Sequence, residues 1–212
     1  MTHPAEDRIA EIVGAVARQA LADRGLRRIA LLDDGGPEAV LAARLLARTL
    51  GEDTVLRITA DGVDVEPFLP LADGVPRWTA EEEIRRLRAR LADGALPAHP
   101  ASKTALLLRG ELPPEPLLPL GDLWATDVAA LAGGWSAPPE VVALAEAAGG
   151  LGALDAALRG WVDGRDAAAL DRLPREAAED VRARLAAGSA SRRNPRVVPK
   201  LGGRTLCIDL ME

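Results

Sequence analysis

The feature that most constrains the fold of this chain is a short apolar run followed at once by two glycines and a proline. Residues 28–40 read Arg-Ile-Ala-Leu-Leu-Asp-Asp-Gly-Gly-Pro-Glu-Ala-Val. An apolar run between charged residues is typical of a strand buried on both faces of a parallel sheet. Gly35 and Gly36 permit a sharp turn, and Pro37 favours a first helical turn, where its missing N–H is not needed. The segment therefore predicts a strand, a tight turn and a helix that runs to about Leu50.

The same turn is a candidate anion site. A strand–turn–helix corner presents backbone N–H groups at the start of the helix, and such a corner can hold a phosphate. Glu38 adds a negative charge to the first helical turn, which the helix dipole favours. An ordinary connection between a strand and a helix explains these residues equally well, so the corner alone leaves both interpretations open.

Further segments extend this corner into a sheet. Residues 54–59 are rich in β-branched side chains and predict a second strand, which the intervening helix makes part of a right-handed βαβ unit. An amphipathic helix is expected within residues 1–24, and Thr104–Leu108 predicts a third strand. These elements predict an α/β fold with a three-layer, doubly wound and mostly parallel sheet.

The second half of the chain is predicted to be mainly helical. Prolines recur between residues 113 and 119 and argue against regular structure there. The tail at 189–212 is basic, contains prolines and ends in a strand-like stretch at 205–210. The 212 residues suffice for one substantial core, so a single domain over residues 1–212 is expected. Helices are predicted from Thr79 and over residues 123–131, 140–147, 151–161 and 166–187.

Composition excludes several classes of function. A formal charge of −6 argues against a nucleic-acid surface, and an aromatic content of 2% leaves few rings for stacking on bases. Cys207 is the single cysteine and His3 and His99 are the two histidines, so neither an internal disulfide nor a clustered zinc site is expected. No apolar stretch has the length of a membrane span, and no basic signal-peptide region is found. We expect a cytoplasmic protein that binds neither nucleic acid nor membranes.

The basic residues are almost all arginine, and the two lysines are Lys103 and Lys200. A lysine supplies a compact ammonium charge that arginine does not reproduce, which makes both candidates for a site. Chance survival of two lysines in an arginine-rich sequence is the simpler explanation.

A late segment resembles a known family. Residues 119–132 read Pro-Leu-Gly-Asp-Leu-Trp-Ala-Thr-Asp-Val-Ala-Ala-Leu-Ala, similar to the Pro-Ile-Gly-Asp-Leu-x-Lys-Thr-x-Val-x-x-Leu-Ala of the NAD synthase family. The helix start at Pro138-Pro139 and the basic tail around Pro199-Lys200-Leu201 are also similar. The resemblance implies the adenine nucleotide alpha hydrolase-like (ATP pyrophosphatase) fold. It further implies an ATP- and magnesium-dependent ligase for NAD biosynthesis, which adenylates a carboxylate and then amidates it, and a homodimer or a pair with a related subunit.

The glycine turn departs from the family pattern. The family's Ser-Gly-Gly-x-Asp-Ser, which grips the ATP pyrophosphate, becomes Asp-Gly-Gly-Pro-Glu-Ala at 34–39, so both serines are absent. Asp34, with Asp33 beside it, puts negative charge where a polyphosphate would lie. Two like charges about 4 Å apart repel by roughly 4 kcal/mol at an effective dielectric constant near 20, which predicts impaired ATP chemistry. The resemblance assigns nucleotide binding to Asp34, Gly35, Gly36 and Glu38, and metal binding to Glu38.

The family's second metal carboxylate, in Gly-Thr-x-Asn-Lys-Ser-Glu, has two possible registers here. By residue identity, residues 102–105 match Asn-Lys-Ser-Glu and the carboxylate becomes Ala105; by the expected strand at 106–108, Glu111 is the metal ligand. The resemblance gives Lys103 and Lys200 catalytic roles, because their positive charge would stabilise the negative transition state. Three hypotheses remain. The first is a ligase with impaired or lost ATP chemistry, and the second is a non-catalytic pseudoenzyme, without a cofactor, that acts as a dimerisation or regulatory partner. The third is a repurposed enzyme on the same scaffold that uses a different nucleotide or none.

Overall fold

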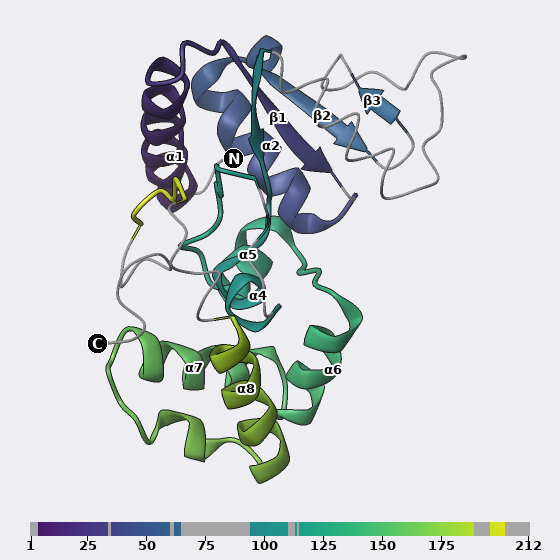
Figure 1. Ribbon diagram of the computed structural model, residues 1–212, viewed down its shortest axis with the longest axis vertical. Coiled ribbons are helices and arrows are strands. Elements are labelled where there is room, and N and C mark those ends of the chain that lie inside the picture. Colours follow the sequence, from purple (N-terminus) through teal and green to yellow (C-terminus); the bar gives the residue numbers. More distant parts are fainter. Residues whose placement is uncertain are drawn as a thin grey trace.

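Two halves of the chain lie one above the other in the computed structural model (Figure 1). The upper half holds a sheet with helices α1 and α2, and the lower half holds helices α6, α7 and α8, with α4 and α5 between them. The structure describes residues 4–33, 35–59, 62–64, 94–109, 113, 115–188 and 196–201.

The sheet has the order β3-β2-β1-β4. Strand β1 (Arg28–Asp33) lies in the centre and runs parallel to β2 (Val55–Thr59) and to β4 (Ala95–Ala98). Strand β3 (Gly62–Asp64) pairs antiparallel with β2 at the edge. Three parallel strands flanked by helices confirm the predicted α/β fold class.

Helices α1 (Pro4–Ala22) and α2 (Pro37–Leu50) pack on each other and contribute to one apolar core with the sheet. Helix α2 begins at Pro37, as predicted, and its C-cap Gly51 has a φ of 88° that suits glycine. After it comes the short 3-10 helix η1 (Glu52–Thr54), which leads into β2. The βαβ unit expected from the sequence is therefore confirmed.

The third parallel strand lies earlier in the chain than predicted. Residues 104–108 belong to helix α4 (Lys103–Leu108), and the strand next to β1 is β4, at residues for which no helix or strand was predicted. A short apolar run that is buried on all sides does not distinguish one and a half helical turns from a strand. Pro97 argued against a strand at β4, because proline has no N–H to donate between strands. Its carbonyl oxygen nevertheless accepts a hydrogen bond from Leu117 N at 3.3 Å. Single bridges from Ala98 to Leu117 and from Leu117 to Val197 continue this edge of the sheet.

The helical half follows the predictions closely, with one correction. The expected helix at 166–187 is two elements, because Pro174 lacks the N–H that a continuous helix needs and instead caps the second one. Apolar side chains of these helices pack into a second core cluster. The elements are α5 (Ala125–Ala132), α6 (Pro139–Ala147), α7 (Leu151–Val162), the 3-10 helix η2 (Ala169–Arg172) and α8 (Arg175–Ala187).

Four sequence-based expectations lie outside the described residues: the helix from Thr79, the strand at 205–210, and the positions of Asp34 and Glu111. Within the described residues, no single helix has the length and apolar character to cross a membrane. Helices α6 and α7 reach that apolar length only as a pair, which is bent by 89°.

Candidate functional site

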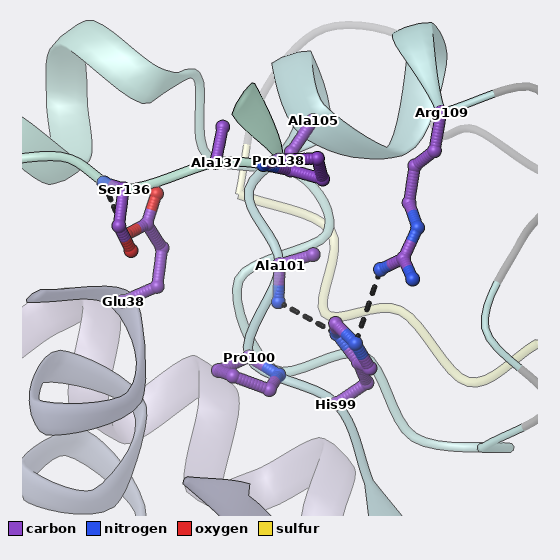
Figure 2. A pocket seen from close by; sticks show the side chains of 9 residues that line it. All are labelled: Glu38, His99, Pro100, Ala101, Ala105, Arg109, Ser136, Ala137 and Pro138. Atoms are coloured by element: carbon purple, nitrogen blue, oxygen red, sulfur yellow. Dashed lines mark hydrogen bonds between the residues drawn. The ribbon is translucent and has the colours of Figure 1, made fainter. Parts of the chain in front are cut away.

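The carboxyl ends of β1 and β4 form the topological switch point of the sheet. The chain leaves β1 through α2 to reach β2 on one side, and β4 lies on the other side of β1. Parallel sheets bind ligands in the crevice outside such strand ends. A cavity of about 280 Å³ lies there, lined by Glu38, His99, Pro100, Ala101, Ala105, Arg109, Ser136, Ala137 and Pro138 (Figure 2).

One wall of this switch-point pocket is the start of α2 held by the segment after α5. Glu38 is buried, and its Oε2 accepts hydrogen bonds from Ser136 N at 2.8 Å and Ser136 Oγ at 2.7 Å. The two segments are also close at Gly134, where an added Cβ would lie 3.2 Å from Pro37 Cγ. The carboxylate assigned to nucleotide and metal thus fastens two segments of the fold to each other.

The opposite wall carries hydrogen-bond donors (Figure 2). His99 directly follows β4, and its Nδ1 accepts a hydrogen bond from Ala101 N at 3.1 Å. Arg109 directly follows α4, and its Nη1 lies 3.1 Å from His99 Nε2. Glu38 thus lies on one side of the pocket, where its carboxylate meets Ser136, and His99 and Arg109 lie on the other side (Figure 2).

The glycine turn is stabilised by Asp33. Gly35 has a φ of 78°, and its N–H donates to Asp33 Oδ1 at 2.9 Å. The guanidinium of Arg57, on the neighbouring strand β2, forms an ion pair with Asp33 Oδ2. The charge of Asp33 is therefore compensated by Arg57 inside the fold. Gly36 is the N-cap of α2.

Lys103 does not line the pocket. Its side chain is 1% exposed, with Nζ 3.1 Å from Asp163 Oδ1, 3.5 Å from Asp122 Oδ1 and 4.6 Å from the centre of the Trp124 ring. Lys200 is exposed on the segment 196–201, beside Leu201, whose N–H donates to Asp122 Oδ2 at 2.8 Å. Neither lysine is among the residues that line the pocket with Glu38. The catalytic roles that the resemblance gives these lysines stay predictions.

A buried hydrogen-bond network supports the start of α4 and α5. Asp155 accepts from Thr104 Oγ1 at 2.6 Å and from Thr126 N at 2.8 Å, and Thr104 Oγ1 in turn accepts from Ala125 N at 3.0 Å. This network was not predicted from the sequence. Asp155 could have indicated it, because an aspartate within the apolar pattern of a helix needs buried hydrogen-bond partners.

The sequence argument missed three polar side chains of the pocket, those of His99, Arg109 and Ser136. His99 would have been recognised had β4 been placed at 95–98, since residues that follow a parallel strand line its carboxyl edge. Among the described residues, no group of three His, Cys, Asp or Glu side chains is arranged to hold a metal ion.

The fold and the place of the pocket define an α/β protein with a pocket at the carboxyl edge of a parallel sheet. Among solved structures, the chain is similar to an NH3-dependent NAD synthetase from Campylobacter jejuni subsp. jejuni NCTC 11168 in complex with the nitrate ion. The TM-score is 0.58 at 14% identity, over 91% of this chain and 98% of that one. No family model and no curated protein matches the sequence. The chain therefore has an NAD synthetase-like fold.

Proposed function

We propose that this chain is an NAD synthase-like protein, related to an ATP-dependent amide ligase, in which the ATP chemistry is impaired or lost. Support for the relation comes from the NAD synthetase-like fold and from the late segment at 119–132. Support for the loss comes from the residues around the switch-point pocket.

The observation that carries the proposal is the hydrogen-bonded state of Glu38. Magnesium prefers several oxygen ligands in near-octahedral geometry. Here Glu38 already accepts two hydrogen bonds from Ser136, and it shares the pocket with the methyl group of Ala105 and the guanidinium of Arg109. A cation placed in this pocket meets like charge on the opposite wall. These residues do not fit magnesium, and we assign no step of a reaction to it.

The position of α4 bears on the register of the second carboxylate. The alternative that made Glu111 a ligand required a strand at 106–108, and these residues are helical. Matching by residue identity puts Ala105 in the place of the carboxylate, and Ala105 lines the same pocket as Glu38. In this register Lys103 acts within the fold, where its ammonium is compensated by Asp122 and Asp163.

Isothermal titration calorimetry with ATP and magnesium, alone and with deamido-NAD, tests the proposal. We expect only heat of dilution from protein shown to be folded by circular dichroism. The double variant Asp34→Ser/Ala39→Ser restores the family's two hydroxyls and is expected to remain without ATP binding, because Ala105 and the Glu38–Ser136 contact are unchanged. Micromolar ATP binding that deamido-NAD tightens would refute the loss of ATP chemistry.

The pseudoenzyme partner role, with a homodimer or a related subunit, stays a prediction. Buried apolar side chains of α6, α7 and α8 pack into the chain's own core. Light scattering coupled to size-exclusion chromatography over a range of concentrations measures whether the protein is a dimer; a monomer throughout contradicts the homodimer.

A further inference from the structure

The apolar side chains that line the switch-point pocket are too short to fill it. Pro100, Ala101 and Ala105 are buried, and Ala137 and Pro138, in the segment before α6, are partly exposed (Figure 2). Alanine and proline have no side-chain rotamers to rearrange, so these residues cannot turn inward and close the space. A preformed cavity of about 280 Å³ with an apolar lining therefore remains.

The polar side chains of the lining make their hydrogen bonds within the protein. Glu38 accepts from Ser136 N and from Ser136 Oγ. His99 has Ala101 N at 3.1 Å from one ring nitrogen and Arg109 Nη1 at 3.1 Å from the other. Glu38, His99 and Arg109 each have further interactions besides these. The polar groups of the lining therefore need no partner from a ligand.

These features select the class of ligand. A charged group that enters the pocket loses its hydration, and the groups that could repay this cost, Glu38 and Arg109, are already engaged by the protein. A nucleobase has donors and acceptors around its edge, and apolar side chains leave these without partners. An apolar molecule loses no hydrogen bonds on entry and gains contacts with side chains that are already in place.

The volume of the pocket sets the size of the ligand. An engineered apolar cavity of about 150 Å³ binds benzene. The switch-point pocket has nearly twice that volume, about 280 Å³, which suits a molecule of one ring or two fused rings. Arg109 lines the pocket and is exposed, so the pocket reaches the surface on that side and a ligand has a way in.

We propose that the switch-point pocket binds a neutral, apolar molecule of one or two rings, held by contacts with the alanine and proline side chains of its lining. The hydrogen bonds of Glu38, His99 and Arg109 stay intact when this ligand is bound. The inference goes beyond the proposed function, because it needs neither a nucleotide nor a metal.

Calorimetric titration of the full chain with matched probes tests the proposal. Toluene and indole are the neutral probes. Benzoate and benzylamine add a charge to the single ring, and adenine is a two-ring molecule with polar edges. We expect each charged or polar probe to bind at least about tenfold more weakly than its neutral match, because its polar groups lose water without gaining partners. Binding of the neutral probes is expected to show a negative heat-capacity change, the mark of apolar burial.

Variants that fill the cavity assign the binding to this pocket. Ala105 on α4 is 3% exposed, and Ala105→Leu is expected to weaken indole binding about tenfold or more, since its side chain takes the place of the ligand. Ala137→Leu narrows the pocket from its partly exposed side and is the second variant if Ala105→Leu does not fold. Ala183→Leu, at an exposed position on α8, is the matched control and leaves indole binding unchanged.

Three results would overturn the proposal. Benzoate, benzylamine or adenine binding as tightly as its neutral match would show that the pocket selects a charged or polar ligand. Undiminished indole binding to folded Ala105→Leu, or to Ala137→Leu where only that variant folds, would place the ligand elsewhere. The third is no binding of either neutral probe at about 10 mM, a very weak limit even for a small ligand. ATP binding is measured separately, so failure here is distinguishable from failure of the proposed loss of ATP chemistry.

Discussion

The corner that follows β1 and the corner that follows β4 both contain a buried charge, but they compensate it differently. At the first corner, Asp33 accepts from Gly35, two residues ahead, and from Arg57 on the adjacent strand. At the second corner, Lys103 meets Asp122 and Asp163, which lie 19 and 60 residues further along the chain. The first corner is thus completed within one βαβ unit, and the second requires the helical half.

Burial also separates the two corners. Arg57 is 22% exposed, so water reaches the ion pair with Asp33, whereas the side chains of Lys103 and Asp122 are almost fully enclosed. A buried ion pair adds little net stability compared with apolar residues, but removing one partner is costly. Asp122 also holds the N–H of Leu201. The second corner therefore fixes how α4, α7 and the segment at 196–201 meet, more than it adds to the free energy of folding.

Truncation of a core leucine, in the sheet half or in the helical half, tests whether the two corners unfold as one cooperative unit. Leu46→Ala on α2 and Leu158→Ala on α7 each remove a fully buried side chain and are expected to cost about 2–5 kcal/mol of unfolding free energy. Urea unfolding followed by circular dichroism and by tryptophan fluorescence measures this, because Trp124, Trp135 and Trp161 all lie in or beside the helical core.

For a single domain, Leu46→Ala shifts the fluorescence transition as far as the circular dichroism transition. Separate midpoints for the two probes would mean that the sheet half and the helical half unfold independently, and the single-domain prediction would be wrong.

Removal of one charge from the second corner is expected to cause the next largest loss in the free energy of unfolding. Asp122→Asn keeps the shape and the acceptor for Leu201 N, yet it takes a carboxylate from a lysine that is 1% exposed. The expected loss is about 3 kcal/mol, the low end for a broken buried pair, because Asp163 remains. The free energy of unfolding from urea titration at pH 7 measures it.

Asp163→Asn is the matched control, since its carboxylate contacts the same ammonium but is 26% exposed. We expect a loss of about 1 kcal/mol, as for a partly solvated ion pair. Equal losses for the two variants would show that burial does not distinguish the two carboxylates.

The first corner was predictable because its signals lie together in the sequence. The apolar run, the glycine pair and the proline of residues 28–40 are all local, and both β1 and α2 are found where they were expected. Helix starts at proline pairs were equally local, and α6 begins at Pro139. Local steric rules determine such elements without knowledge of the rest of the fold.

The second corner was not predictable by those means. Pro97 made β4 resemble a loop, and the apolar run at 104–108 fits a strand or a buried helix. The partners of Lys103 are distant carboxylates on elements whose packing no local pattern encodes. Of the predicted site residues, Glu38 lines the pocket, and its hydrogen-bond partner Ser136 lies 98 residues away; its metal role stays a prediction.

A smaller effect is expected at the first corner. Arg57→Gln leaves the buried carboxylate of Asp33 with the N–H of Gly35 and is expected to cost about 1–2 kcal/mol, less than at the second corner because Arg57 is partly solvated. The double variant Asp33→Asn/Arg57→Gln removes both charges of the ion pair, and the asparagine side chain at position 33 still offers an acceptor for the N–H of Gly35. We therefore expect it to recover most of the stability that Arg57→Gln loses. If the stability losses of Asp33→Asn and Arg57→Gln, each measured alone by thermal unfolding, added up to that of the double variant, the ion pair would not be the cause of the Arg57→Gln loss.

The smallest effect concerns the backbone of the glycine turn. Gly35 has a φ of 78°, and among the described residues beyond its chain neighbours no atom lies within 4 Å of an added Cβ, so Gly35→Ala changes mainly the conformational preference and is expected to cost about 1 kcal/mol. Gly152 on α7 also has open space, but its backbone is helical, and Gly152→Ala is expected to stabilise the protein by about 0.5 kcal/mol. Opposite signs in the urea midpoint of the two variants would attribute the need for glycine in this corner to its left-handed φ. A loss of the same size at both positions would instead mean that the turn tolerates the Cβ and that the Asp33 carboxylate alone determines its shape.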